Sequence, residues 1–281
     1  MANEPVSVVI PTYNRATVLK RALTSVLNQT VAPAEILVVD DGSIDDTRAV
    51  VRQFINASVP MRYIRISNSG VSHARNLGIR RAQHSWIALL DSDDEWLPNR
   101  LATQLELAAA NPQYQLIHGE EIWVRQGKRV NPRHKHRKSG GHIFQRSLEL
   151  CLISPSAALL RRELLDDVGW FDEDFVVCED YDLWLRVTAR HEIGFVTEPI
   201  IIKYGGHDDQ LSAKYRAMDY WRVLAMDKVA HLENLAHEDR AALQQQLLQK
   251  ASILLKGYAK HKNYAHWQQV QSLYKSYENR P

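Results

Sequence analysis

The sequence is poor in cysteine and contains no long uninterrupted apolar run. Its 281 residues include two cysteines, Cys151 and Cys178. Two are too few for a disulfide framework in a chain of this length, so reduced thiols are the simpler expectation. No apolar stretch approaches the ~20 residues that a membrane-spanning helix needs. These absences argue against a disulfide-stapled fold and a membrane-spanning segment, and leave a globular chain of one large domain, alone or with an appendage.

The sequence also lacks a large excess of charge of either sign. The formal net charge is +2, so we expect no general attraction to nucleic acid. The first residues, "MANEPVSVVIPTYNR", lack a basic region followed by a long apolar stretch, so no signal peptide is predicted. We therefore expect a cytoplasmic protein. Peripheral contact with the inner face of the plasma membrane remains an alternative.

Strand and helix patterns alternate four times between residues 6 and 112. The predicted strands cover 6–10, 35–43, 61–66 and 85–91, and the predicted helices follow at 14–30, 43–54, 70–83 and 97–112. Asn14 is a candidate cap of the first helix, and Ser43 with Asp46 resembles a capping box for the second. The alternation predicts an α/β fold whose mostly parallel sheet is flanked by helices.

Three of these strands end in polar groups: "PTYN", "DDGS" and "DSDD". In a parallel sheet the carboxyl ends of the strands meet at one edge, and ligands bind beyond that edge. The three segments should therefore lie close together. This convergence predicts a binding site at the edge of the sheet, and the prediction needs no knowledge of any protein family.

The segment "LLDSDDEWLP" (89–98) carries four acidic side chains within five positions. Asp91 and Asp93, separated by Ser92, form a D-x-D pair at a strand end, which is an arrangement that holds Mg²⁺ or Mn²⁺ together with substrate phosphates. Such a cation would neutralise charge on a departing diphosphate. The alternative is an exposed acidic turn that begins the next helix. Asp94 and Glu95 are expected to be peripheral.

The other two strand ends offer candidate contacts for a nucleotide. A carboxylate at Asp40 or Asp41 can accept hydrogen bonds from a base or ribose, as in other doubly wound folds. Pro11, Thr12 and Tyr13 follow the first strand, where they would meet the base. The alternative for "DDGS" is a turn with a helix cap, a role that can coexist with nucleotide binding, and the alternative for Thr12 and Tyr13 is ordinary turn chemistry.

Three further sites carry candidate chemistry. Arg75 lies near a helix start, where a guanidinium and free backbone amides both favour a diphosphate, although a surface arginine is the plain alternative. Glu179 and Asp180 open another predicted helix (179–191), where a carboxylate can act as general base or can simply complement the helix dipole. His207 in "GGHDDQLS" is either a turn residue or a metal ligand.

Two segments fall outside this pattern. No acidic residue occurs from Ile122 to Leu148, and the basic stretch within 125–146 is predicted to be a long loop. It either attracts a phosphate-bearing ligand, touches anionic lipid, or is a solvated loop that closes over a bound ligand. Residues 213–281 are rich in helix formers and predict a helical appendage. That appendage packs on the rest of the chain, pairs with a second copy in a homodimer, or lies on a membrane.

Taken together, the motifs "VSVVIPTYNR", "EILVVDDGSIDDT", "NSGVSHARNLGI", "WIALLDSDDEWLPNRL" and "EDYDLWLR" resemble those of a family 2 glycosyltransferase of the GT-A type. The resemblance covers about residues 5–212, with the motifs in the family's order. It implies a Rossmann-like nucleotide-sugar half (1–120), an acceptor half (121–212) and a C-terminal helical extension (213–281).

The resemblance also implies a reaction and a set of roles. The reaction is inverting transfer from a nucleoside diphosphate sugar, with UDP the expected nucleotide, to a hydroxyl of a glycan or lipid-linked acceptor in polysaccharide or cell-envelope synthesis. Asp40, helped by Asp41, would read the base, and Asp180 would be the catalytic base, oriented by Glu179. The divalent metal, Mn²⁺ or Mg²⁺, would be held by Asp93, Asp91 and His207.

Three competing functions are weighed against this one. A nucleotidyltransferase would want a glycine-rich loop after the first strand, and "PTYNRAT" has none. A dinucleotide oxidoreductase would want G-x-G-x-x-G at the same place, which is also missing. A non-catalytic nucleotide-sugar or glycan-binding scaffold would be favoured by loss of the D-x-D or the "ED" pair, and both are present.

Overall fold

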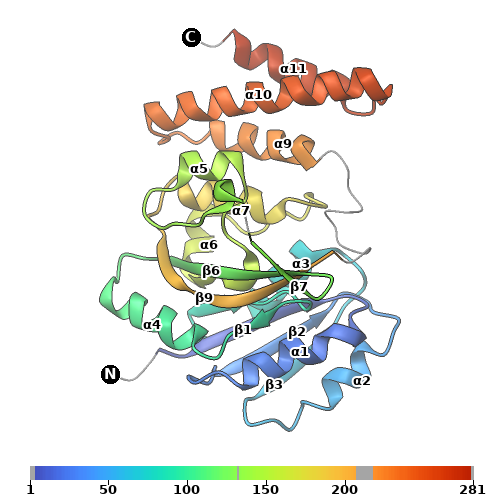
Figure 1. Ribbon diagram of the computed structural model, residues 1–281, viewed down its shortest axis with the longest axis vertical. Coiled ribbons are helices and arrows are strands. Elements are labelled where there is room, and N and C mark those ends of the chain that lie inside the picture. The colour runs from blue at the N-terminus through green and yellow to red at the C-terminus, as the bar shows by residue number, and fades with distance from the viewer. Residues whose placement is uncertain (1–3, 132, 207–217, 280–281) are drawn as a thin grey trace.

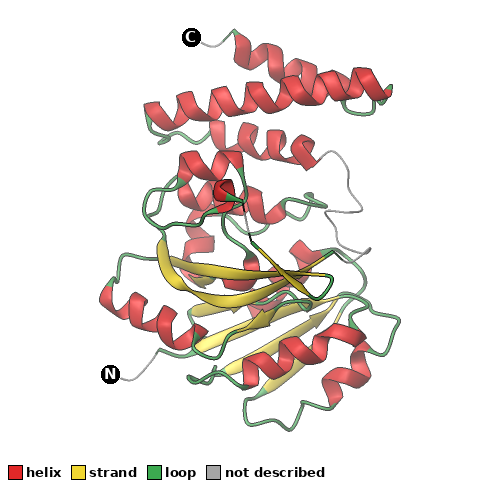
Figure 2. Cartoon of the chain, in the orientation of Figure 1, coloured by secondary structure: helices red, strands yellow, loops and turns green. Residues whose placement is uncertain are grey.

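The computed structural model describes residues 4–131, 133–206 and 218–279. A central sheet is flanked by helices, and three helices from the end of the chain stack beyond it (Figure 1; Figure 2). The strands are β1 (Val6–Thr12), β2 (Glu35–Asp40), β3 (Met61–Arg65), β4 (Trp86–Leu89), β5 (Glu95–Trp96), β6 (Leu116–Arg125), β7 (Lys128–Val130), β8 (Leu159–Arg161) and β9 (Gly194–Gly205). The α-helices are α1 (Ala16–Leu27), α2 (Thr47–Arg52), α3 (Val71–Arg81), α4 (Arg100–Ala110), α5 (Phe144–Glu149), α6 (Arg162–Val168), α7 (Glu179–Thr188), α9 (Met218–Ala230), α10 (His237–His261) and α11 (Trp267–Glu278).

The strand order is β3-β2-β1-β4-β8-β6-β9-β5, with β7 paired to β6. The first four strands in this order are parallel, as the alternation of strand and helix predicts. Beyond them the sheet is mixed, because β8 runs antiparallel to both β4 and β6 while β9 runs parallel to β6. The predicted α/β fold is confirmed, and the mixed half lies in the part of the chain without a clear alternation.

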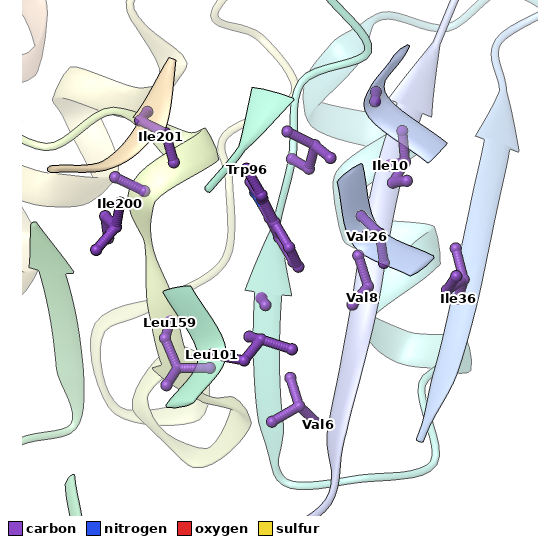
Figure 3. Close-up of a cluster of buried hydrophobic side chains, with 14 of the residues drawn as sticks. Val6, Val8, Ile10, Val26, Ile36, Trp96, Leu101, Leu159, Ile200 and Ile201 are labelled. Atoms are coloured by element: carbon purple, nitrogen blue, oxygen red, sulfur yellow. The ribbon is translucent and has the colours of Figure 1, made fainter. Parts of the chain in front are cut away.

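Alternating residues of β1 enter two separate hydrophobic cores, as expected for a strand buried on both faces. Val8 and Ile10 pack on one face with side chains from α1 and α4, and Trp96 lies among them (Figure 3). Val9 points to the other face, against α3, α6 and α7. All three β1 residues are fully buried. Both helix layers therefore hold the strand in place and fix the position of its carboxyl end.

The C-terminal helices share a third core with the rest of the molecule. Phe144 and Leu148 of α5 and Tyr181 of α7 cluster with buried apolar side chains of α9 and α10. The Tyr181 hydroxyl also donates a 2.7 Å hydrogen bond to the carbonyl of Leu148. This packing buries apolar side chains of α9, α10 and α11 against the rest of the chain. Within the described ranges, no helix combines the length and hydropathy needed to cross a bilayer.

The two predicted helix caps were wrong, because the side chains concerned form hydrogen bonds with residues that are distant in the sequence. Asn14 does not cap α1: its side-chain oxygen accepts a 2.8 Å bond from the amide of Ile44, and Asp45 accepts from the amide of Ala16 instead. Ser43 forms no capping box, because its hydroxyl accepts a bond from the amide of Asn14.

The predicted 125–146 loop was also wrong in part. Its first residues complete the β6–β7 hairpin, a short 3₁₀ helix follows at His134–His136, and α5 begins at Phe144. The helix predicted over 179–191 is α7, which ends at Thr188.

Candidate active site

The three polar strand ends meet at one edge of the sheet, as predicted. Thr12 and Asp40 are register partners in the parallel pair β1–β2, and the amide of Asp41 donates a 2.8 Å bond to the carbonyl of Thr12. On the other side of β1, the amide of Leu90 bonds the carbonyl of Val9, which brings the D-x-D segment beside the other two.

Asp40 and Asp41 organise the loops around this edge. Asp40 is fully buried, and its carboxylate accepts bonds from the Tyr63 hydroxyl and, at 2.8 Å, from the amide of Ser43. Asp41 accepts bonds of 2.7 and 2.9 Å from the amides of Ser69 and Gly70, just before α3. Both carboxylates therefore hold the backbone of the loops at this edge of the sheet in place.

The first strand end presents one buried and one exposed side chain. The Thr12 hydroxyl is buried and has no hydrogen-bond partner among the described residues. Tyr13 is 47% exposed, an unusual state for a large aromatic ring beside a buried strand. A buried hydroxyl without a protein partner is free to bond a water molecule or a ligand group. An exposed ring offers a surface on which a base can stack.

The D-x-D turn is anchored by groups from three other parts of the chain. Arg21 of α1 donates to the carbonyl of Asp93 while its guanidinium lies 3.5 Å from the ring centroid of Tyr204. Asp94, expected to be peripheral, is buried instead. It accepts bonds of 2.6 Å from the Ser156 hydroxyl and 3.0 Å from the amide of Tyr204. The turn is thus built into the sheet and is not a free surface turn.

Asp91 and Asp93 are the acids of this turn that stay partly open. Their side chains are 25% and 21% exposed, and Ser92 between them is buried. Burial and the neighbouring Asp91 charge raise the pKa of Asp93 above its ordinary value, and Arg15, 3.9 Å away, offsets this only in part. Two carboxylates whose charges are incompletely compensated make a favourable place for a cation.

Arg75 joins this turn to the start of α7. One guanidinium nitrogen donates a 2.7 Å bond to Asp91, and another donates a 2.6 Å bond to Glu179. Burial alone would lower the pKa of Arg75, but the two carboxylates outweigh it and raise that pKa. The structure therefore places Arg75 at the predicted edge, but with its guanidinium engaged by two acids.

Glu179 and Asp180 differ sharply in surroundings. Glu179 is 5% exposed, and its burial raises its pKa to about 7, although Arg75 counteracts this. Asp180 is partly exposed, and its carboxylate accepts bonds from the amide of Tyr181 at 2.7 Å and from the Cys151 thiol at 3.4 Å. Of the two, Asp180 is the carboxylate that an incoming hydroxyl can reach.

Cys178, directly before this pair, adopts the left-handed region at φ 61°. This conformation is costly for a residue other than glycine and persists only where the surroundings impose it. Here it begins α7, so it sets the direction in which Glu179 and Asp180 leave the backbone.

Lys203 of β9 is a site residue that the sequence patterns do not indicate. Its ammonium donates a 3.0 Å bond to the Ser154 hydroxyl. Burial would lower its pKa, but the surrounding acids, first Glu121 and then Asp94, Asp91 and Asp180, raise it instead. The only signal in the sequence is a lysine inside the apolar run "PIIIKYGG".

The described residues supply two carboxylates, Asp91 and Asp93, that fit a divalent cation. The Asp91 and Asp93 carboxylates supply oxygen ligands of the kind that Mg²⁺ and Mn²⁺ take, with substrate phosphates completing the shell. No group of three or more His, Cys, Asp or Glu residues suited to a metal occurs in the described part of the chain. His207, the predicted third ligand, lies outside the described residues.

Comparison with known proteins agrees with this geometry. The family model described as "Glycosyl transferase family 2" matches residues 7–169, more than half of the chain. A UDP-Glc:alpha-D-GlcNAc-diphosphoundecaprenol beta-1,3-glucosyltransferase, WfgD, of Escherichia coli is 32% identical over 197 residues, covering 68% of this chain and 72% of the relative. A putative teichuronic acid biosynthesis glycosyltransferase, TuaG, of Bacillus subtilis (strain 168) is 40% identical over 103 residues, or 36% of this chain and 40% of TuaG.

Other relatives are much longer than the shared region. The match to an uncharacterized glycosyltransferase of Rickettsia bellii (strain RML369-C), 31% identical over 201 residues, covers 69% of this chain but 28% of the relative. The chain thus spans less than a third of that protein's length.

Solved structures share the fold at low sequence identity. The S. aureus TarS 1–349 complex with UDP-GlcNAc superposes with a TM-score of 0.70 at 18% identity, covering 97% of this chain and 92% of the other. A mannosyltransferase of Pyrobaculum calidifontis in complex with GDP-Man and Mn²⁺ gives a TM-score of 0.66 at 19% identity, covering 99% and 87%. The family model and the fold agree: this chain belongs to glycosyltransferase family 2 and is a glycosyltransferase.

Proposed function

We propose that the protein transfers a sugar with inversion from a UDP-linked donor to a hydroxyl of a glycan or lipid-linked acceptor in cell-envelope or polysaccharide synthesis. The observation that carries the proposal is the Arg75 bridge. It ties Asp91, at the expected diphosphate position, to Glu179, the neighbour of the proposed base. WfgD, whose name gives a UDP-Glc donor and a diphosphoundecaprenol-linked acceptor, supports the substrate class.

The proposed step is a single displacement at the anomeric carbon. The acceptor oxygen forms a bond to that carbon while the bond to the diphosphate oxygen breaks, and the electron pair leaves with the nucleoside diphosphate. Asp180 takes the proton from the acceptor hydroxyl. Asp180 suits this role better than Glu179, since Glu179 is buried and paired with Arg75.

The donor site follows the three strand ends. Pro11, Thr12 and Tyr13 flank the base, with the Thr12 hydroxyl and the Tyr13 ring available to it, while Asp40 and Asp41 hold the loops that enclose it. Asp91 and Asp93, with Ser92 between them, would hold the Mn²⁺ or Mg²⁺, and His207 is the remaining ligand that we propose. When bound, that cation neutralises charge on the diphosphate leaving group. The Lys203 ammonium supplies further positive charge on the same side.

Calorimetric titration with UDP, dTDP, GDP and ADP, with and without Mn²⁺, tests the donor site. Of the four nucleotides, we expect UDP to be the one that binds tightly, and we expect it to do so only when Mn²⁺ is present. Asp93→Ala should abolish the increase in UDP affinity that Mn²⁺ causes. Asp46→Ala, which removes an exposed acid near the same edge, should leave that increase intact. Binding by the Asp93 variant equal to wild type would refute the metal assignment.

The base assignment has its own pair of variants. Asp180→Asn should reduce transfer by about 10²–10⁴-fold, the usual contribution of a general base, while UDP affinity stays unchanged. Asp174→Asn, which alters an exposed acid in the turn before α7, is the matched control and should keep full activity. Turnover by Asp180→Asn within tenfold of wild type would remove Asp180 from the mechanism.

A further inference from the structure

A basic groove lies beside the proposed active site, on the segment that is rich in lysine and arginine. It has a volume of about 540 Å³, within the range of ligand pockets. Four cationic residues line it, together with one acid and one aromatic ring: Lys135, Arg137, Lys138, Arg146, Glu149 and Phe195. Neither the strand-end motifs nor the proposed chemistry uses this groove.

The wall of the groove is held in place by the buried contacts of Lys138 and by two surface hydrogen bonds of Arg146. The Lys138 ammonium lies 2.6 Å from a carboxylate oxygen of Glu121 and donates a 2.6 Å bond to the carbonyl of Leu152. Arg146 donates to the Ser139 hydroxyl and to the carbonyl of Arg137, and so fixes the turn that carries them. These contacts fix the backbone that carries Lys135 and Arg137, and a fixed backbone lowers the entropic cost of binding an anion there.

The same turn is fastened by Ile193, the residue just before β9, and by a buried histidine. Gly141 and Ile193 form a two-way backbone bridge, with bonds of 2.7 and 3.1 Å. The buried His118 ring contacts the carbonyl of Ser139 at 3.0 Å. A Cβ on Gly140 would meet the carbonyl oxygen of Ile193 at 2.5 Å, so this turn sits directly on the strand.

Two of the cations are open to a ligand. Lys135 and Arg137 are exposed, and no acidic side chain in the described part of the chain forms a salt bridge with either of them. A guanidinium next to an ammonium is the donor set that recognises phosphate oxygens. Glu149 is a single opposing charge, and Phe195 adds an apolar surface.

Only one chain segment separates the groove from the proposed base. Lys138 bonds the carbonyl of Leu152, and the preceding residue, Cys151, donates its thiol hydrogen bond to Asp180. We propose that the basic groove binds the phosphate or diphosphate of the acceptor, so that the acceptor is anionic and its sugar hydroxyl extends from the groove toward Asp180. This inference rests on the proposed transferase function and names the acceptor's chemistry.

The first experiment uses inorganic pyrophosphate in metal-free buffer, where the proposed donor site loses its affinity for a diphosphate. Calorimetry compares wild type with Lys135→Gln/Arg137→Gln and with Lys128→Gln/Arg129→Gln. The second pair removes the same charge from the exposed β7 hairpin outside the groove. We expect the groove variant to bind about tenfold or more weakly, as loss of two charge-assisted hydrogen bonds requires, and the hairpin variant to match wild type.

The donor-site variant Asp93→Ala separates this inference from the proposed function. Pyrophosphate binding that survives in Asp93→Ala but is lost in the groove variant supports the groove, even if no nucleotide binds. Binding that is lost in Asp93→Ala and kept in the groove variant overturns it, and so does equal weakening in the groove and hairpin variants.

The second experiment compares two acceptors with the same sugar, one linked to a lipid diphosphate and one to an uncharged aglycone. The groove variant should raise the KM for the diphosphate acceptor alone, with kcat and UDP affinity unchanged. Binding to vesicles of phosphatidylcholine with phosphatidylglycerol tests the other source of phosphate. If the groove variant loses vesicle binding while its KM for the diphosphate acceptor stays that of wild type, the groove contacts headgroups and the inference fails.

Discussion

Replacing Arg75 by methionine tests the most connected ion pair in the site. The guanidinium is 4% exposed and bonds Asp91 and Glu179 at 2.7 and 2.6 Å. Methionine keeps much of the apolar bulk beside Phe171, whose ring centroid lies 5.2 Å from the guanidinium carbon. The substitution therefore removes the charge and the two bonds while it leaves most of the packing.

The expected loss depends on pH, because Glu179 titrates near neutrality. Burial raises its folded pKa from 4.5 to about 7, so the folded state keeps a proton that the unfolded state has already lost. Stability therefore falls as pH rises from about 4.5 to 7, and then levels off. Without Arg75 the folded pKa rises further, and the fall continues above pH 7 at about 1.4 kcal/mol per pH unit.

These values set the size of the effect. At pH 5.5 Glu179 is protonated with or without Arg75, so the variant loses mainly the partly exposed pair with Asp91, about 1 kcal/mol. At pH 8.5, which is 1.5 units above the wild-type pKa of Glu179, the loss of unfolding free energy in the variant grows by about 2 kcal/mol. The total of about 3 kcal/mol is typical of a broken buried ion pair.

Urea denaturation followed by circular dichroism at pH 5.5 and 8.5 measures both losses. Arg81→Met, an exposed arginine on the same helix, is the matched control and should change stability by less than about 0.5 kcal/mol at either pH. A loss that is equal at the two pH values would mean that Glu179 does not titrate against Arg75. A loss below 1 kcal/mol at pH 8.5 would refute the buried bridge itself.

Three further changes probe the supports of the site by the same denaturation assay. Burial, and after it the Lys138 charge, lowers the pKa of His118 to about 3. The unfolded chain therefore binds a proton below pH 6.5 that the folded chain does not, and the free energy of unfolding falls as pH falls. Between pH 6.5 and 4.5, His118→Gln should lose about 2 kcal/mol less of this free energy than wild type does. Gly140→Ala should cost about 1–3 kcal/mol, because its Cβ would press on the Ile193 carbonyl. Asp41→Ala should cost about 1–3 kcal/mol and weaken UDP binding, since two backbone amides before α3 lose their acceptor.

The sequence predicts the sheet edge well because the signals there are local. A short apolar run that ends in "DDGS" or "DSDD" contains its strand, its turn and its polar group within about ten residues. Parallel pairing then brings Thr12, Asp40 and the D-x-D turn together by topology alone. For the same reason the family motifs, each short and contiguous, indicated the fold correctly.

Residues whose roles depend on distant partners could not be predicted in this way. The side chains of Asn14, Ser43 and Asp45 bond backbone amides across two loops about thirty residues apart. From the sequence alone, Asn14 and Ser43 therefore look like caps of the helices that follow them. Asp94 was expected at the surface because its partners, Ser156 and Tyr204, come from segments with no visible link to it.

The D-x-D turn and the "ED" pair, read from the sequence as two separate motifs, form one electrostatic unit in the structure. Their acids are 88 residues apart at Asp91 and Glu179, yet a single buried guanidinium bonds both. Any change in the charge at Asp91 therefore alters how strongly Arg75 holds Glu179, and Glu179 in turn is the charged neighbour of Asp180. Burial raises the pKa of Glu179 to about 7, and the neighbouring Asp180 charge acts in the same direction, so the proposed base belongs to the same electrostatic unit as the D-x-D turn.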